Sequence, residues 1–130
     1  MSFKDISPSL EDYLEAILGV MEKNEKVRVT DLSEQLNVAK SSVNQAVQKL
    51  MDLGLVTHEK YGPLELTVTG KNQAEVVRRR HRHLKDFLIN VLGVDPITAE
   101  KDACAMEHHI SAVTLEKLIA FLKEGIRPSD

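Results

Sequence analysis

The order of signals between residues 30 and 68 constrains the fold of this chain most. A short segment with apolar Leu32 and Leu36 precedes a longer one, and in both the apolar positions recur at helical spacing up to Gly54. Two β-prone runs then flank Tyr61-Gly62-Pro63, which is a turn signal. A short helix, a longer helix and a hairpin in this order are typical of a winged helix-turn-helix.

Composition indicates that the rest of the chain is helical. The chain has 130 residues, of which 42% are hydrophobic and 28% are charged, and it contains three Phe, two Tyr and no Trp. Aliphatic packing of this kind favours helices, so we expect a mostly α fold. The length fits one ordinary domain or two small ones that share a continuous helix, and we place the division at 1–70 and 71–130.

Periodicity and cap signals define the expected elements. Ser7-Pro8 begins the first helix, and Gly54 and Gly93 end later ones. Thr30 is the expected N-cap of the short helix. We expect helices at about 8–23, 30–37, 40–53, 69–92, from 96 onwards and up to 123, and strands at 55–60 and 64–68; Ser111 or Thr114 caps the last helix.

Cysteine content and hydropathy predict a reducing compartment. The single cysteine, Cys104, cannot form an internal disulfide. No stretch combines a basic start, an apolar core and a cleavage site, and no apolar run approaches the roughly 20 residues that span a bilayer. We therefore expect a soluble, cytoplasmic protein whose thiol is reduced.

The net charge of −3 is unevenly distributed. Residues 40–80 hold seven Lys or Arg and four Asp or Glu, which is a local balance of +3. Basic surface supplies most non-specific DNA affinity, so this segment is the better candidate for binding nucleic acid. The remainder is acidic, as expected for a carboxylate-bearing metal and dimer region.

The helix that begins near Lys40 has the composition of a DNA-reading helix. Short polar side chains lie near its start, and apolar residues recur behind them for the core. Any one of these polar residues is at least as often part of a solvated face, but the hairpin that follows makes the set more specific. The predicted base-reading residues are Ser41, Ser42, Asn44, Gln45 and Gln48, and the predicted phosphate contacts are Lys40, Lys49 and Lys60.

A second group of residues suits a transition metal. Cys104, Glu107 and His108 fall at i, i+3 and i+4, which are offsets that share one face of a helix. Asp12 and Glu15, at i and i+3 of the first helix, offer two carboxylates on one face. An isolated residue of these types is usually core or solvated surface, so the clustering carries the prediction.

Two histidines lie between these segments, in R-R-R-H-R-H. His81 and His83 are two residues apart, so a helix cannot direct both side chains to one point. At most one of them is a direct ligand, and the spacing alone does not choose between them.

Four segments in a fixed order carry a family resemblance: S-P-S-L-E-D-Y-L-E, N-V-A-K-S-S-V-N-Q-A-V-Q-K-L, L-V-T-H-E-K-Y-G-P-L-E-L-T-V-T-G and E-H-H. Together they resemble the DtxR/MntR family of metal-dependent repressors, over residues from about 5 to 123. The resemblance implies a winged helix-turn-helix DNA-binding domain followed by an all-helical dimerisation and metal-binding domain. It also implies a homodimer that binds operator DNA and no membrane. In length the chain is similar to the shorter, manganese-responsive branch, which lacks an SH3-like domain.

The resemblance also implies a ligand set. Cys104 stands where manganese-type members have a carboxylate and iron-type members a cysteine, and a thiolate shifts preference from Mn²⁺ towards softer ions. We expect Fe²⁺ or Mn²⁺ as the physiological ion, with Co²⁺, Ni²⁺ or Zn²⁺ as substitutes in vitro. The ligand positions implied by the family fall on Asp12, Glu15, His81, Cys104, Glu107 and His108.

One position departs from the family pattern. Lys85 stands four residues after His81, where family members often carry a carboxylate that helps an ancillary or second metal. Glu100 could partly supply that role. We therefore expect one metal per subunit rather than two.

Two other classes of function are compatible with some of these residues. A thiol-sensing winged-helix regulator would use Cys104 for oxidation, and it should respond to peroxide in chelated buffer. A metal-dependent enzyme is the third reading. The chain lacks a Gly-rich phosphate loop and a nucleophile elbow, and the helix positions of the metal-capable residues already have a regulatory explanation, so we expect no enzyme activity.

Overall fold

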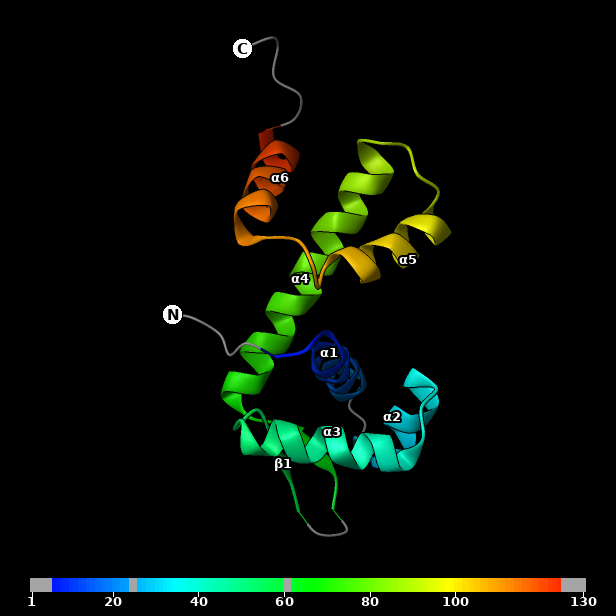
Figure 1. The fold of residues 1–130 in the computed structure, drawn as a ribbon, viewed down its shortest axis with the longest axis vertical. Helices are drawn as coiled ribbons and strands as arrows, with labels where there is room; N and C mark the ends of the chain where they lie inside the picture. Colours follow the sequence, from blue (N-terminus) through cyan, green and yellow to red (C-terminus); the bar gives the residue numbers. More distant parts are fainter. Residues whose placement is uncertain (1–5, 24–25, 60–61, 125–130) are drawn as a thin grey trace. The chain divides into compact units, whose positions relative to one another are not determined.

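The computed structural model describes residues 6–23, 26–59 and 62–124 (Figure 1). Contacts divide the chain into two compact units, Met1–Val76 and Val77–Asp130, and the boundary falls inside one helix. The predicted mostly α fold is confirmed. The elements are α1 (Pro8–Glu22), α2 (Val29–Leu36), α3 (Lys40–Asp52), β1 (Val56–His58), β2 (Leu64–Leu66), α4 (Val68–Asn90), α5 (Pro96–Met106) and α6 (Ala112–Glu124).

The first helix packs its apolar face into the core of the first unit. The Ser7 hydroxyl accepts a hydrogen bond from the Leu10 N–H at 3.2 Å. Pro8 suits the first helical position, where a missing N–H leaves no hydrogen bond unmade. Leu14 and Ile17 are fully buried. The predicted cap and the predicted amphipathic helix are therefore confirmed.

The helices α2 and α3 form the helix-turn-helix. α2 begins at Val29, so the prediction of Thr30 as its N-cap was wrong. The backbone N–H of Arg28 donates to the Asp31 carboxylate at 3.0 Å, and this bond starts the helix earlier. Asn37 adopts a left-handed conformation with φ of 55°, which ends α2 and redirects the chain into α3.

The strands β1 and β2 form an antiparallel wing. Their register pairs Val56 with Leu66 and His58 with Leu64. Both strands are shorter than predicted. The second strand ends early because α4 begins at Val68. Val27 also bridges to this hairpin, and its carbonyl accepts a hydrogen bond from the Leu64 N–H at 2.8 Å. The wing is thereby tied to the segment that leads into α2.

A close backbone contact joins the wing to α4. This helix begins at Val68, slightly before the predicted start, because the Thr67 hydroxyl accepts a hydrogen bond from the Gly70 N–H at 3.0 Å. The same hydroxyl donates to the Gly54 carbonyl at 2.8 Å. A Cβ at Gly70 would stand 1.9 Å from the Leu55 carbonyl oxygen. A residue without a side chain is therefore required where the first turn of α4 passes the backbone of Leu55.

The second unit has its own small apolar core between α4 and α5. Leu84 and Leu88 of α4 are buried together with Ala99 and Ala103 of α5. Phe87 and other half-buried apolar residues, including Leu118 of α6, pack around them. Among the described residues, no helix is long and apolar enough to span a membrane.

The end of α5 differs from the sequence-based prediction. The helix stops at Met106, so Cys104 lies on it, whereas Glu107 and His108 lie in the turn that follows. The Ile110 N–H donates to the Met106 carbonyl at 3.0 Å, and Ile110 packs against the core of the second unit. Glu107 nevertheless keeps helical backbone angles, φ −59° and ψ −25°, so the offset from Cys104 is preserved.

The cap of the last helix follows one of the two expected alternatives. The Ser111 hydroxyl accepts a hydrogen bond from the Thr114 N–H at 3.2 Å. Ser111 therefore caps α6, and Thr114 lies in its first turn.

Candidate metal centre and DNA-reading helix

Two buried alanines bring α5 against α4. Ala99 and Ala103 lie one turn apart, and both are fully buried against leucines of α4. Small side chains allow the two backbones to approach closely. Glu100 and Cys104 each follow one of these alanines, and both contact His81 of α4. The packing of the second unit therefore places three metal-capable side chains together.

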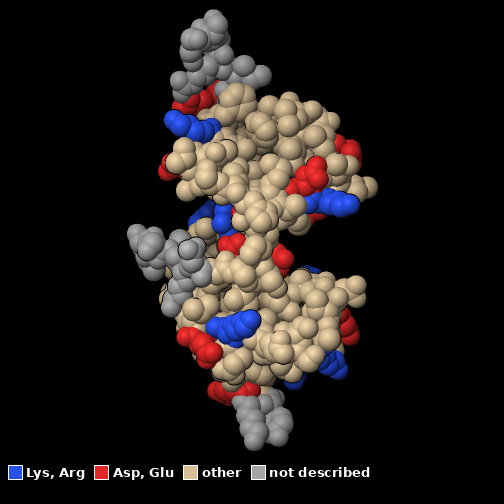
Figure 2. Space-filling view, in the orientation of Figure 1, with Lys and Arg blue, Asp and Glu red and all other residues tan. Residues whose placement is uncertain are grey.

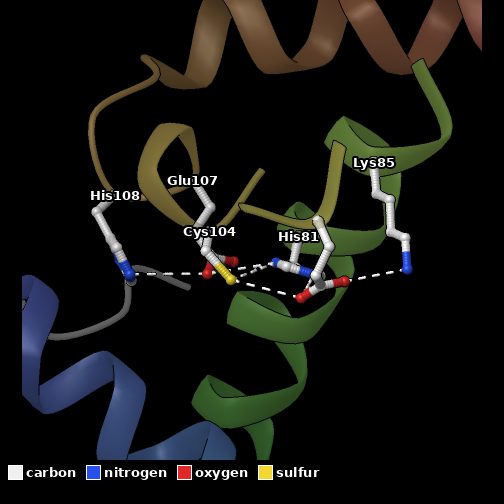
Figure 3. A network of polar contacts seen from close by, with 6 residues as sticks. His81, Lys85, Cys104, Glu107 and His108 are labelled. Carbon is white, nitrogen blue, oxygen red and sulfur yellow. Dashed lines mark hydrogen bonds and ion pairs between the residues drawn. The ribbon is translucent and has the colours of Figure 1, made fainter. Parts of the chain in front are cut away.

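Glu107 and His108 extend this group beyond the end of α5 (Figure 3). His81 Nδ1 lies 3.6 Å from Glu107 Oε1 and 3.7 Å from Cys104 Sγ. His108 Nε2 lies 3.7 Å from the same Glu107 oxygen. Donor atoms held about 2.0–2.3 Å from one ion lie roughly 3–3.7 Å from one another. The observed separations therefore fit side chains that share a cation.

The Glu107 carboxylate is buried without hydrogen bonds. Its exposed fraction is 1%, and neither oxygen has a hydrogen-bond partner among the described residues. Burial of an ionised carboxylate costs on the order of several kcal/mol unless a cation or donors compensate for it. The two imidazole nitrogens stand just beyond hydrogen-bonding distance of Oε1. The residues present therefore fit a divalent cation bound to this carboxylate.

The neighbouring carboxylates shift the titration of His81. Its interaction with Glu107 raises the pKa of His81 to about 9; burial opposes this increase, and Glu100 contributes to it. The hydrogen bond from His81 lowers the pKa of Glu100 to about 2, with burial opposing and Lys85 assisting. Without a metal, this cluster therefore favours an imidazolium paired with carboxylates.

Glu100 joins Lys85 to His81 on the opposite side of the imidazole ring. The Lys85 ammonium lies 3.0 Å from Glu100 Oε1, and His81 Nε2 lies 2.9 Å from Glu100 Oε2. The Cys104 thiol donates to the same Oε2 at 3.5 Å. His81 therefore directs Nδ1 towards Glu107 and Cys104, while its Nε2 is engaged by Glu100.

The remaining predicted ligands are two carboxylates of α1 and one of the two histidines of α4. Asp12 is exposed and Glu15 is half-buried on α1, which belongs to the first unit, and their participation stays a prediction. Of the two histidines that α4 carries, His81 makes the contacts described above. His83 Nδ1 is buried and has no hydrogen-bond partner among the residues that the structure covers. The contacts therefore favour His81 as the single histidine ligand from this helix.

The helix α3 has the two faces that a DNA-reading helix requires. Its buried face is formed by Val43, Ala46, Val47 and Leu50. The Gln48 amide donates to the Asp52 carboxylate at 3.0 Å, so this predicted reader already has a partner on its own helix. Lys60 lies outside the described residues. The predicted contact residues that are exposed on α3 are Lys40, Ser41, Ser42, Asn44, Gln45, Gln48 and Lys49.

Charged side chains are interspersed on the face drawn in Figure 2, where Lys or Arg lies next to Asp or Glu in both units. This face carries no large basic area among the residues described. A DNA contact through α3 would therefore use short polar side chains together with a few lysines.

Two family descriptions match consecutive parts of the chain. Residues 5–64 match the family described as "Iron dependent repressor, N-terminal DNA binding domain". Residues 67–125 match "Iron dependent repressor, metal binding and dimerisation domain". The first match runs from α1 to the first residue of β2, and the second contains α4 to α6 with the candidate metal centre.

Relatives match over most of the chain. The sequence is 38% identical over 120 residues to an uncharacterized HTH-type transcriptional regulator of Methanocaldococcus jannaschii, covering 92% of this chain and 96% of the relative. It is also 38% identical over 112 residues to the HTH-type transcriptional regulator MntR of Shouchella clausii, covering 86% and 78%. These proteins are transcriptional regulators, which removes the support for an enzyme.

Solved structures of manganese regulators have the same fold. The manganese regulator SloR is 32% identical with a TM-score of 0.80, covering 91% of this chain and 55% of that chain. A manganese-dependent transcriptional repressor in complex with manganese is 33% identical with a TM-score of 0.81, covering 88% and 52%. This chain spans about half the length of these two structures. With both family descriptions matched in order and relatives 38% identical over most of their length, the chain belongs to the DtxR/MntR family of metal-dependent transcriptional repressors.

Proposed function

We propose that this protein represses genes of metal-ion homeostasis and that Mn²⁺ or Fe²⁺ activates its binding to DNA. It acts in the cytoplasm as a homodimer on double-stranded operator DNA. The MntR relatives and the manganese-regulator structures support this class of function. The match of residues 67–125 to a metal-binding and dimerisation domain supports the homodimer.

The observation that carries this proposal is the buried carboxylate of Glu107. Two imidazoles face one of its oxygens at 3.6 and 3.7 Å, and neither oxygen has a hydrogen-bond donor among the described residues. Without a metal, the His81 imidazolium is the group that offsets this buried anion, and a divalent cation among the same nitrogen and sulfur donors would offset it more fully. The proposed ligands are Asp12, Glu15, His81, Cys104, Glu107 and His108.

Charge repulsion gives the proposed switch its physical basis. The proposed ligands come from α1 as well as from α4 and the end of α5, and the three carboxylates among them would repel one another at a shared site. A bound divalent cation supplies the positive charge that offsets this repulsion. Coupling of about 1–3 kcal/mol between metal and DNA would change DNA affinity by roughly 5–150-fold.

A DNA-binding titration tests this function directly. A fluorescently labelled duplex is first enriched from random-sequence DNA with the metal-supplemented protein, and its anisotropy is then measured against protein concentration. Titrations are made in chelator and with Mn²⁺, anaerobic Fe²⁺, Co²⁺ or Zn²⁺. Stimulation by Mn²⁺ or Fe²⁺ is expected. Tight binding in chelator that no metal increases, but that peroxide changes, would instead favour oxidation of Cys104 as the switch.

Cys104 should set the order of metal preference. The Cys104→Glu variant replaces a soft thiolate by a hard carboxylate, so we expect the ranking of activating metals to move towards Mn²⁺. Competition between Mn²⁺ and Co²⁺ in the anisotropy assay measures this shift. The exposed Ala105→Glu variant is the control for added charge nearby. An unchanged ranking in Cys104→Glu would mean that the thiol does not bind the metal.

Gln45 should contribute to operator choice without affecting metal uptake. It is exposed on α3, whereas the neighbouring Ala46 and Val47 are buried. If it reads a base, Gln45→Ala should lose about 1–3 kcal/mol of discrimination at one base pair. Metal affinity should stay at the wild-type value. Gln35→Ala, an exposed glutamine of α2, is the matched control. Equal losses of affinity for all sequences would contradict a base contact.

A further inference from the structure

Lys85 supplies a fixed positive charge beside the candidate metal centre. Its ammonium lies 3.0 Å from Glu100 Oε1, and the other oxygen of that carboxylate lies 2.9 Å from His81 Nε2. The three side chains therefore form a continuous chain from the surface of α4 to the imidazole. Lys85 is about one-third exposed and Glu100 about half exposed, at 35% and 48%.

His81, Glu100 and Cys104 would by themselves make a plausible metal-binding group. One ligand atom from each lies within 4.8 Å of the others. This group shares His81 and Cys104 with the centre around Glu107. A second cation beside the first would therefore require the Glu100 carboxylate as a ligand.

The contacts of Glu100 indicate that it is not available. One oxygen is paired with the Lys85 ammonium, and the other accepts hydrogen bonds from His81 and Cys104. A cation bound to Glu100 would have to displace Lys85 or lie close to its positive charge, which costs Coulomb energy. It would also have to compete for His81 Nε2, whereas the centre around Glu107 uses Nδ1.

We propose that Lys85 takes the place of a second metal ion, that Glu100 orients His81 instead of binding metal, and that each subunit therefore binds one metal. Carboxylates that accept a hydrogen bond from a metal-binding histidine fix its ring and its tautomer. Lys85 and Glu100 are thus positioning residues that act through His81. This inference rests on the proposed function, since it presumes that the centre around Glu107 binds a metal.

The charge balance gives Lys85 a second role in the same arrangement. A metal-bound cysteine is deprotonated, so Cys104 would carry a negative charge next to the Glu100 carboxylate, only 3.5 Å away. The Lys85 ammonium offsets the Glu100 charge at that point. Lys85 therefore allows a thiolate and a carboxylate to remain neighbours while one divalent ion is bound.

Stoichiometry of Co²⁺ binding tests the proposal. The full chain is dialysed to equilibrium against Co²⁺, bound metal is measured by elemental analysis, and the thiolate-to-cobalt absorption band reports the ion at Cys104. Wild type is expected to bind one Co²⁺ per subunit, and so is K85R, which keeps the charge. K85E is expected to bind two, because it replaces the resident cation by a ligand. Lys101 is the exposed neighbour of Glu100, and the control variant K101E is expected to bind one Co²⁺.

Each further outcome has a defined meaning. Two ions bound to wild type, or one ion bound to a K85E protein with native circular dichroism, would overturn the role of Lys85. If K85E does not fold, K85Q is measured instead. K85Q is expected to bind a second Co²⁺ with lower affinity, and the absence of this ion would also overturn the role of Lys85. Adding E100Q to K85E should remove the second ion and leave the thiolate band. Wild type that binds no Co²⁺ and shows no thiolate band would refute the proposed function itself, so the two failures are distinguishable.

A separate titration examines Glu100 as a positioning residue. E100Q should still bind one Co²⁺ and keep the thiolate band, with affinity reduced by about 10–100-fold because His81 loses its carboxylate acceptor. Unchanged affinity in E100Q would show that Glu100 does not orient the ligand. Thermal unfolding of the metal-free variants confirms that the losses do not come from unfolding.

Discussion

Replacing Glu107 by alanine should abolish the effect of metal on DNA binding. The carboxylate lies between His81 and His108 and is 1% exposed, so its removal takes away the buried anion that both imidazoles face. In the anisotropy titration, the metal-supplemented Glu107→Ala variant should fall to the affinity of the chelated wild type, a loss of roughly 5–150-fold.

The metal-free protein should tolerate the same change unusually well. Truncation of a large buried side chain normally costs a few kcal/mol, but here it also removes an anion without hydrogen bonds. We therefore expect circular dichroism and dimer formation to be retained. Glu116→Ala, which truncates an exposed glutamate of α6, is the matched control. Full metal stimulation in Glu107→Ala would remove this residue from the metal centre and, with it, the main support for the proposed function.

Replacing Gly70 by alanine should be the most destabilising single-methyl change in the first unit. The added Cβ would lie 1.9 Å from the Leu55 carbonyl oxygen and 2.8 Å from its carbonyl carbon. Both are backbone atoms, so no side-chain rotation can relieve the clash. The first turn of α4 and the backbone of Leu55 would have to separate, and we expect a loss of more than about 3 kcal/mol in the free energy of unfolding.

Gly19 provides the matched control, because it lies inside α1 and a Cβ there meets nothing within 4 Å. Gly19→Ala should raise the free energy of unfolding by about 0.5–1 kcal/mol, since alanine loses less backbone freedom in a helix. Urea unfolding of both variants measures the difference, with the free energy of unfolding extrapolated to zero urea using the same slope against urea concentration. If Gly70→Ala unfolds within about 0.5 kcal/mol of wild type, the close approach of α4 to Leu55 is not rigid.

Local signals in the sequence predicted most of the elements and several of their ends. Ser7 caps α1, and Gly54 and Gly93, with φ of 75° and 73°, follow the ends of α3 and α4 as expected. These signals act within one helical turn, so the sequence alone contains them. The i, i+3, i+4 spacing likewise predicted that Cys104, Glu107 and His108 would lie near one another.

Other features were decided by particular contacts that the sequence pattern does not indicate. The N-cap of α2 is Arg28, two residues before the predicted Thr30, because the local bond between the Arg28 N–H and the Asp31 carboxylate outweighed the cap propensity of Thr30. The pairing of Val27 with Leu64 joins segments 37 residues apart, and no local pattern indicates it. The end of α5 at Met106 likewise depends on the packing of Ile110 against the core of the second unit.

The sequence by itself therefore determined the order of helices, the wing and the chemical types gathered in residues 104–108, because periodicity, caps and ligand chemistry are local properties. Only the tertiary structure decided what each metal-capable side chain faces. The packing of Ala99 and Ala103 on α4 brings Glu100 to His81 and to Lys85. It also selects His81 over His83 and leaves Glu107 buried without donors. Burial, pairing and ring orientation depend on which side chains of another helix lie opposite, and a one-dimensional pattern does not specify that contact.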